Sequence, residues 1–131
     1  MSDDLPFRAV SRQLMAAASS GDVDKIGAVF AADGTVWHNI TGKTCSASEA
    51  GAMFSAMAAH IKNLDYEDIR FTPLENGFVQ QHRLVGDVGA GRLNADACIV
   101  CEVRDGMICR IEEYIDSRAL SDAGLVLTPA A

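Results

Sequence analysis

The second half of the chain is a series of strand-like segments joined by short turns, and this pattern constrains the fold more than any other feature. The segments lie at residues 67–74, 77–88, 92–103 and 107–118. Strands that follow one another through short turns pair with their neighbours in antiparallel order. The sequence therefore predicts an antiparallel meander, one face of which the preceding segments must cover. The turn residues between the strands are Glu75-Asn76-Gly77, Gly89-Ala90-Gly91 and Asp105-Gly106.

Three helices are predicted ahead of the meander. Apolar residues recur at helical spacing over residues 7–18, and Asp22 can cap a second helix that ends near Asp33-Gly34. A capping box that starts at Ser46 introduces a third helix, whose apolar residues continue to Leu64. Residues between the second and third helices are β-branched and aromatic, so they are predicted to form a further strand, Thr35-Val36-Trp37-His38-Asn39.

Length and charge limit the possible functions. A chain of 131 residues with 49% hydrophobic residues can bury one core, so a single domain over residues 1–131 is expected. The formal net charge of −7 would repel a polyanion, which argues against nucleic-acid binding. The acidic start is unlike a secretory signal, and no apolar run approaches the roughly 20 residues of a membrane span. We expect a cytoplasmic protein that does not contact membranes.

Cys98 and Cys101 have the C-x-x-C spacing of many metal and redox sites. Both fall in the predicted strand at 92–103, where residues three apart point to opposite faces, so they cannot bind one metal together. We therefore expect no metal site, and no flavin, nicotinamide or phosphate motif suggests a cofactor. Buried, reduced thiols are expected at all four cysteines, which are Cys45, Cys98, Cys101 and Cys109.

Both faces of the last two predicted strands are apolar. A monomer would leave one of these faces exposed to water, so we expect a homodimer that forms through the outer face of the sheet. The tail from Leu120 to Ala131 lacks a clear period and is expected to pack loosely.

Two segments carry a resemblance to a known superfamily. Residues 30–39, after a helix that contains Ser20-Gly21-Asp22, resemble the opening of the nuclear transport factor 2-like superfamily, and residues 104–116 resemble its closing hairpin. The closing hairpin is most similar to the SnoaL-like polyketide cyclase, limonene epoxide hydrolase and ketosteroid isomerase branches. The resemblance implies an α+β, cystatin-like fold. Its three N-terminal helices would pack in the concave face of a strongly curved antiparallel sheet with a mixed edge, a cone-shaped barrel around one pocket.

The ketosteroid isomerases in this superfamily imply one set of site residues. Their proton-shuttling Asp falls at His38, and the Asp of their oxyanion hole falls at Asp96 if one residue is gapped. Their oxyanion-hole Tyr falls at Leu14, which carries no hydroxyl and departs from that pattern.

The limonene epoxide hydrolases imply a second set. The Arg of their charged trio matches Arg83, one Asp meets Glu113 and the other meets Val85, which cannot carry out that role. Their water-holding Tyr and Asn fall at Trp37 and Asn39, which share one strand face while His38 occupies the other. The resemblance thus implies a pocket for acid/base chemistry but neither faithful epoxide hydrolysis nor faithful steroid isomerisation.

The period of a strand identifies one candidate without the resemblance. Glu113 shares a face with Ile111 and Ile115, and a carboxyl group in apolar surroundings suits a general acid or base. A structural ion pair with Arg83 is the alternative. Alternation leaves open whether Arg83 or His82 faces the pocket, and the resemblance favours Arg83.

We expect a cofactor-free acid/base enzyme of isomerase, cyclase or dehydratase type, acting on a small apolar polyketide-, steroid- or terpenoid-like molecule. The alternative is a non-catalytic ligand-binding or dimerisation module of the same fold. His60 is expected to be a packing residue. The catalytic candidates are Glu113, His38, Asp96 and Arg83. The candidates for substrate binding are Trp37, Asn39, Leu14, Met53, Met57, Val85, Ile111 and Ile115.

Overall fold

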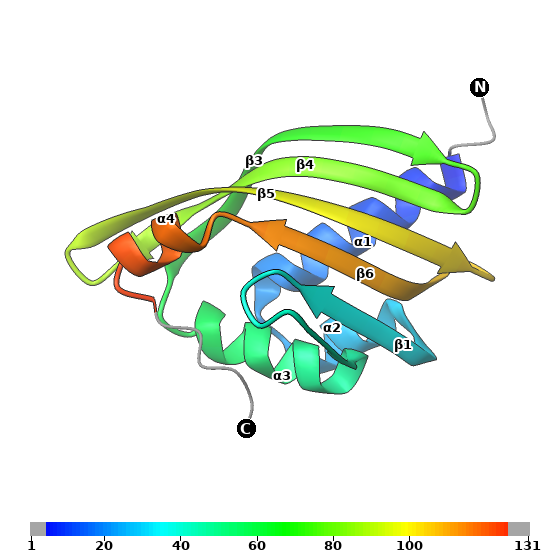
Figure 1. The fold of residues 1–131 in the computed structure, drawn as a ribbon, viewed down its shortest axis with the longest axis horizontal. Coiled ribbons are helices and arrows are strands. Elements are labelled where there is room, and N and C mark those ends of the chain that lie inside the picture. The colour runs from blue at the N-terminus through cyan, green and yellow to red at the C-terminus, as the bar shows by residue number, and fades with distance from the viewer. Residues whose placement is uncertain (1–4, 126–131) are drawn as a thin grey trace.

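The computed structural model describes residues 5–125, which form helices on one side of a curved sheet (Figure 1). The helices are α1 (Leu5–Ser20), α2 (Val23–Ala28), α3 (Ala47–Ala58) and α4 (Ser117–Asp122). The strands are β1 (Phe30–His38), β2 (Lys43–Ser46), β3 (Lys62–Leu74), β4 (Gly77–Val88), β5 (Gly91–Arg104) and β6 (Met107–Ile115). None of these helices is long and apolar enough to cross a membrane.

The sheet has the strand order β2-β1-β6-β5-β4-β3. Strands β3 to β6 form the antiparallel meander expected from the sequence. Strand β1 pairs in parallel with β6, so the sheet is mixed, and β2 and β3 are its two edges. The expected α+β arrangement is confirmed, with a strongly curved sheet that does not close into a barrel.

Helix α1 runs behind the central strands in Figure 1, on the inner side of the sheet. Val10 and Leu14 of this helix pack in one core cluster with Phe78, Ile99 and Ile111 from β4, β5 and β6. A second cluster surrounds the other half of the sheet and includes apolar residues of α3, β4, β5, β6 and α4. The space between the helices and the inner face of the sheet is therefore walled mainly by apolar side chains.

The second helix is shorter than the sequence suggests. Asp22 caps α2 as expected, because its carboxylate accepts hydrogen bonds from the backbone N–H groups of Asp24 and Lys25. The helix then ends at Ala28, and β1 begins at Phe30 with an irregular register between Phe30 and Thr35. The predicted extension to Asp33-Gly34 is wrong because burial of Phe30 and its pairing with Ile108 outweigh local helix preference.

The third helix also ends earlier than expected. Its capping box is present, since Ser46 and Glu49 exchange hydrogen bonds at the first turn of α3. The helix stops at Ala58, and Leu64 belongs to β3, so the apolar spacing up to Leu64 joins two different elements.

The loose packing predicted for the tail is wrong for residues 120–125. Asp116 caps α4 by accepting hydrogen bonds from the N–H groups of Arg118 and Ala119. Leu120 and Leu125 are buried in the second core cluster. Leu120 on the helix and Leu125 after it are enough to anchor this segment to the core. Two residues are too few to show a helical period in the sequence. The remainder of the tail, 126–131, lies outside the described residues.

Candidate functional site

A cavity of about 120 Å³ lies between the helices and the inner face of the sheet. Its wall consists mostly of apolar side chains from α1, α3, β1, β4, β5, β6 and α4. Dry apolar cavities of about 150 Å³ bind molecules the size of benzene, so the cavity is of the right order for a single ring or a short branched chain. The titratable groups in its wall are His38, Tyr66, His82 and Glu113.

Glu113 enters the cavity from the middle of β6. Its neighbours on the same strand face, Ile111 and Ile115, also line the cavity, as the alternation of the strand requires. Its carboxyl group makes no hydrogen bond or ion pair with any residue in 5–125, and the accessible part of the side chain faces the cavity. Desolvation by burial raises the pKa of Glu113 to about 7, because no nearby cation stabilises the charged form.

His38 is the neighbour of Glu113 on the adjacent strand. The two residues are register partners in the parallel pairing of β1 with β6, and paired strands lie about 4.8 Å apart, so both side chains reach the same part of the cavity. His38 Nδ1 lies 3.4 Å from Thr41 Oγ1. Burial lowers the pKa of His38 below its usual 6.5. Near neutral pH the site therefore holds a neutral imidazole beside a carboxyl group that is partly protonated.

Asn39 holds this pair of strands in register instead of lining the cavity. Its side-chain amide donates to the carbonyl of Ile115 and accepts from the N–H of Ile115, each at 3.0 Å. Its own N–H donates to the carbonyl of Glu113 at 3.1 Å. Asn39 thus continues the pairing of β1 with β6 beyond the end of β1, next to Glu113.

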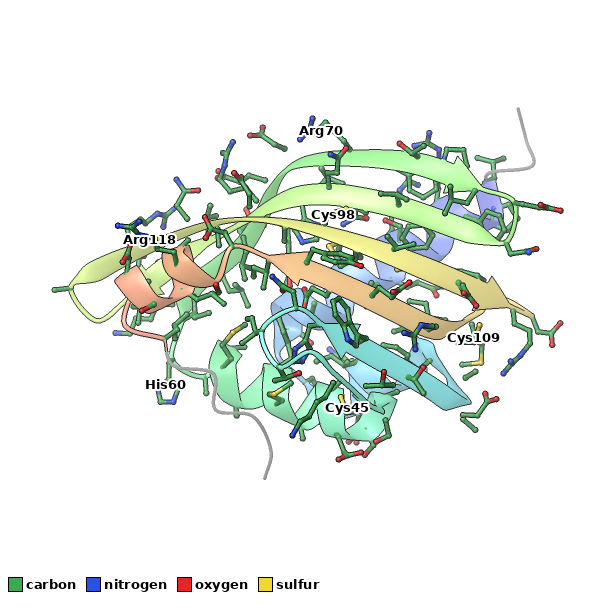
Figure 2. The ribbon with its side chains drawn as sticks, viewed as in Figure 1. Cys45, His60, Arg70, Cys98, Cys109 and Arg118 are labelled. Atoms are coloured by element: carbon green, nitrogen blue, oxygen red, sulfur yellow. The ribbon has the colours of Figure 1, made fainter. Side chains whose placement is uncertain are left out.

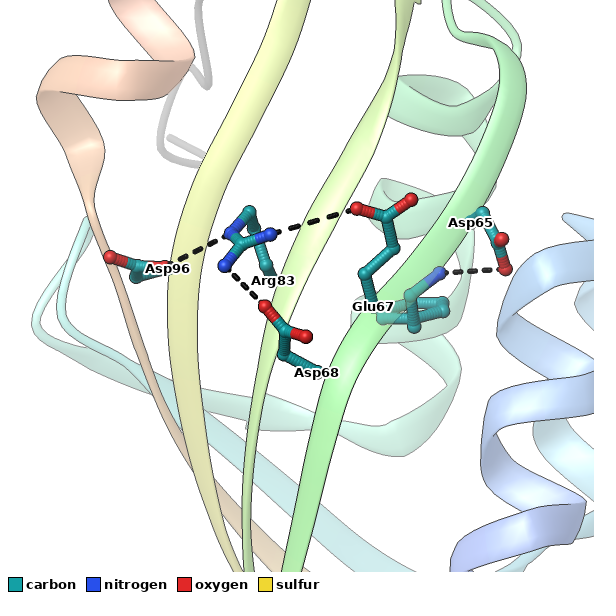
Figure 3. Close-up of polar contacts among 6 residues, drawn as sticks. Asp65, Glu67, Asp68, Arg83 and Asp96 are labelled. Carbon is teal, nitrogen blue, oxygen red and sulfur yellow. Dashed lines mark hydrogen bonds and ion pairs between the residues drawn. The ribbon is translucent and has the colours of Figure 1, made fainter.

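The alternation of β4 turns His82 inward and Arg83 outward. His82 is buried beside Gln80 and Leu84 on the inner face, and burial lowers its pKa to about 4. Arg83 lies on the outer face, where Nη1 is 3.6 Å from Glu67 and Nε is 3.7 Å from Asp96 (Figure 3). Its Nη2 also donates to Asp68.

Arg83, which the resemblance favoured as the residue that faces the pocket, therefore faces away from it, and it makes no ion pair with Glu113. Asp96 is the register partner of Arg83 on β5 and is likewise directed outward, with its side chain 89% exposed. Neither residue lines the cavity, so neither can act on a molecule bound there. The resemblance led to this error because the relatives' charged residues were transferred by alignment, whereas strand alternation together with the burial of His82 decides the face.

The candidates for substrate binding divide between the two sides of the sheet. Trp37 packs against Tyr114 with the rings tilted by 57° and their centroids 5.2 Å apart, and Asn39 lines an open groove on the outer face. Val85 is buried but does not line the cavity, so these three expectations are not met. The remaining five line the cavity, and they are Leu14, Met53, Met57, Ile111 and Ile115.

Tyr66 is a cavity residue that the sequence did not place in the site, and His82 is one that strand alternation had left open. The rings of Tyr66 and His82 meet edge to face with centroids 4.9 Å apart. Burial and the nearby Glu113 raise the pKa of Tyr66, so its hydroxyl stays protonated. Strand β3 carries two register shifts, between Lys62 and Asp65 and between Glu67 and Arg70, and these break the alternation that would otherwise have identified Tyr66.

The cysteines show the same division between faces. Cys101 belongs to the core, whereas Cys98 lines the outer groove, so the two side chains of the C-x-x-C pair diverge as expected. Cys45, Cys98 and Cys109 lie on three different strands and are half-buried, which corrects the expectation of full burial (Figure 2). Figure 2 also shows His60 at the end of α3, where it is exposed and not a packing residue.

Residues 11–111 match the family of the SnoaL-like domain. No curated protein sequence matches the chain.

Solved structures show the same fold at low identity. A hypothetical protein with a ketosteroid isomerase-like fold from Catenulispora acidiphila DSM 44928, in complex with trimethylamine, has a TM-score of 0.76 and 20% identity, covering 92% of this chain and 97% of that one. A provisionally named polyketide cyclase from Xanthomonas campestris pv. campestris has a TM-score of 0.76 and 19% identity, over 91% and 96% of the two chains. A provisionally named SnoaL-like polyketide cyclase from Jannaschia sp. CCS1 has a TM-score of 0.78 and 11% identity, over 97% and 94%. The fold implied by the opening and closing segments is thereby confirmed.

Proposed function

The chain belongs to the SnoaL-like domain family, and from that premise we propose that it binds a small, largely apolar molecule in its cavity and transfers protons on it without a cofactor. The observation that carries this proposal is Glu113, a carboxyl group in an apolar cavity with no counter-ion among the described residues and with its pKa raised to about 7. A group whose pKa lies near the working pH is best suited to give and take protons. Isomerisation, cyclisation and dehydration each need one proton removed and another added.

His38 and Glu113 can divide these two steps between them. Neutral His38 can accept a proton from a carbon of the bound molecule, because burial keeps its imidazole uncharged near neutral pH. The protonated fraction of Glu113 can donate a proton to a carbon of the resulting anion or to a leaving oxygen. Since the two residues are register partners, both groups are positioned by the backbone pairing of β1 with β6.

The size of the cavity narrows the substrate. A void of about 120 Å³ holds a single ring or a short branched chain, so of the polyketide-, steroid- and terpenoid-like molecules that the resemblance suggested, we propose one of monocyclic size. A four-ring steroid would need α3 or α4 to move away from the sheet.

A second candidate function is binding without catalysis. The relative from Catenulispora acidiphila was solved in complex with trimethylamine, a base that is cationic at neutral pH. Glu113 has no cationic partner within residues 5–125, so an ammonium ligand would supply the missing charge and hold the carboxyl group ionised.

Native mass spectrometry of the protein as purified tests these proposals. A retained neutral molecule of monocyclic size that the protein converts on incubation would support the enzyme. A retained amine that is released unchanged would support the binding protein, and a tightly held molecule with several fused rings would contradict the proposed size limit.

We also propose that the outer face of the sheet, defined here by Trp37, Ile69, Arg83, Cys98 and Tyr114, is covered by a second copy of the chain. Tyr114 is 45% and Ile69 49% exposed, although both are large and largely apolar. This face also carries the open groove that Cys98 and Arg83 line. The apolar side chains of this face gain stability when a partner removes them from water. Arg83, which shares the face, is already paired with Glu67, Asp68 and Asp96.

Light scattering at micromolar concentration should therefore report a dimer, and Tyr114→Lys should shift it toward the monomer. Trp37 is the chain's single tryptophan and contacts Tyr114, so its fluorescence should change on dilution in step with dissociation. Lys43→Glu, an exposed change on the edge strand β2, is the control and should leave the dimer intact. A wild-type protein that stays monomeric would contradict the proposal.

A further inference from the structure

A buried polar chain leads from α1 to the cavity wall. Ser11 on α1 and Gln80 and His82 on β4 are all buried, and the side chain of Gln80 has no accessible surface. Ser11 Oγ donates to Gln80 Oε1, and Gln80 Nε2 lies 3.0 Å from His82 Nδ1. The proposed function uses none of these contacts. Buried polar groups are costly unless they are paired, so a chain of this kind holds its members in one arrangement.

Met15 fixes the direction of the hydrogen bonds in this chain. Gln80 Nε2 also lies 3.0 Å from Met15 Sδ, and a thioether sulfur can accept a hydrogen bond but cannot donate one. The amide NH₂ group of Gln80 must therefore point toward Met15, and its second N–H points toward His82 Nδ1. Reversing the amide would place an oxygen against the sulfur, two acceptors with no hydrogen between them.

The tautomer of His82 follows from this direction. Nδ1 accepts from Gln80, so in the neutral ring the proton must be on Nε2. Nε2 makes no hydrogen bond with a residue in 5–125. Among these residues, no fully buried side-chain nitrogen or oxygen lacks a partner, so Nε2 reaches open space, and the imidazole lines the cavity.

We propose that His82 is a fixed, neutral hydrogen-bond donor to the cavity through Nε2, that Gln80 and Ser11 are the positioning residues that set its tautomer, and that the bound molecule carries an acceptor oxygen of the carbonyl class. This inference deepens the proposed function, and the role of His82 in catalysis rests on that function. Its role as a hydrogen-bond donor to a bound carbonyl oxygen does not require any turnover.

The proposed arrangement gives each group one part in an enolisation. His38 takes a proton from the carbon beside the carbonyl, and the electrons of the broken C–H bond form a carbon–carbon double bond. The π electrons of the carbonyl move onto its oxygen, where the Nε2–H of His82 stabilises the negative charge without transferring its proton. A neutral imidazole can polarise a carbonyl through its N–H without giving up the proton. Glu113 then delivers its proton to the same carbon, which exchanges the hydrogen, or to another carbon, which completes an isomerisation. The proton held by His38 passes back to Glu113 and restores both groups.

The environment of His82 keeps the ring neutral. Burial lowers its pKa to about 4. Three titratable groups face the same cavity: Tyr66, whose ring contacts His82 edge-on from β3, Glu113 on β6 and His38 on β1. His82 should therefore stay uncharged while Glu113 titrates.

Nitrogen-15 NMR of the histidine rings tests the tautomer in the ligand-free wild-type protein. We expect His82 to show the Nε2–H pattern, with no titration between about pH 5.5 and pH 8. Gln80→Leu should remove the fixed tautomer and leave a mixture, whereas Gln81→Leu, an exposed change at the next residue of β4, should leave the pattern unchanged. An Nδ1–H pattern in the wild-type protein, or titration of His82 near pH 6.5, would overturn the proposal.

Binding of three matched probes tests the ligand class. Cyclohexanone has an acceptor oxygen, methylenecyclohexane has the same shape without one, and cyclohexylamine carries a positive charge. We expect cyclohexanone to bind about tenfold more tightly than methylenecyclohexane, as one neutral hydrogen bond allows, and His82→Phe should bring the two affinities together. Equal affinities for these two probes in the wild-type protein, or tightest binding of cyclohexylamine, would refute the assignment of a carbonyl ligand. None of these measurements needs turnover. If the expected affinities are found but no catalysis is, the proposed enzymatic function fails while the assignment of His82 as a donor stands.

Discussion

Glu113→Gln should abolish proton exchange on a carbonyl probe while leaving the probe bound. In heavy water the wild-type protein should replace the hydrogens beside the carbonyl of cyclohexanone with deuterium, which NMR measures directly. The variant should be slower by about 10²–10⁴-fold, the usual contribution of one general acid or base. Glutamine has nearly the same shape as glutamic acid, so the affinity for cyclohexanone should change by less than about tenfold.

Glu112→Gln is the matched control for this experiment. Glu112 precedes Glu113 on β6 and points to the outer face, where its carboxylate is 3.9 Å from Arg110. Its loss should leave the exchange rate within about twofold of the wild-type value, because an exposed ion pair contributes little. Equal rates in the wild-type protein and Glu113→Gln would refute the catalytic role of Glu113 and favour binding without catalysis.

Strand alternation explains which part of the site could be predicted from the sequence. Strand β6 keeps a regular period from Arg110 to Ile115, so the sequence alone places Glu113 between two inward isoleucines. The register of β1 with β6 then places His38 beside it. Predicting these two residues as part of the site required only that the strands and their inward faces be assigned correctly.

The missed residues lie where that regularity fails or where an alignment replaced it. Strand β3 has two register shifts, and Asp68 within it has a positive φ of 53°, so counting by two cannot identify the face on which Tyr66 lies. Strand β4 is regular, and there the error came from transferring the relatives' arginine to Arg83. The pattern of Phe78, Gln80, His82 and Leu84 contains two polar residues, which made the buried face look exposed in the sequence.

Glu113→Gln should also stabilise the protein above pH 7, by up to about 3 kcal/mol. The pKa of Glu113 rises from 4.5 to about 7 on folding, and each unit corresponds to about 1.4 kcal/mol. Between these pH values the folded protein holds a proton that the unfolded chain has released, so the Glu113 contribution to the free energy of unfolding falls as pH rises. Below pH 4.5 both states are protonated and the contribution vanishes. Above pH 7 the penalty is constant, and water in the cavity would reduce it below the upper limit.

His38 and His82 also change the stability with pH, so the effect of Glu113 must be measured as the stability difference between the wild-type protein and Glu113→Gln. His82 and His38 have lowered pKa values in the folded state, so the unfolded chain binds more protons at mildly acidic pH and their contributions increase stability as pH rises toward 6.5. In the wild-type protein these opposing slopes largely cancel. Urea unfolding of both proteins from pH 4 to pH 9 removes the histidine contributions, since the two proteins share them. The stability difference should be near zero at pH 4, grow between pH 4.5 and pH 7, and then stay level. A difference that does not change with pH would mean that Glu113 ionises normally in the folded protein, and the site would lose the titratable group on which its acid/base chemistry depends.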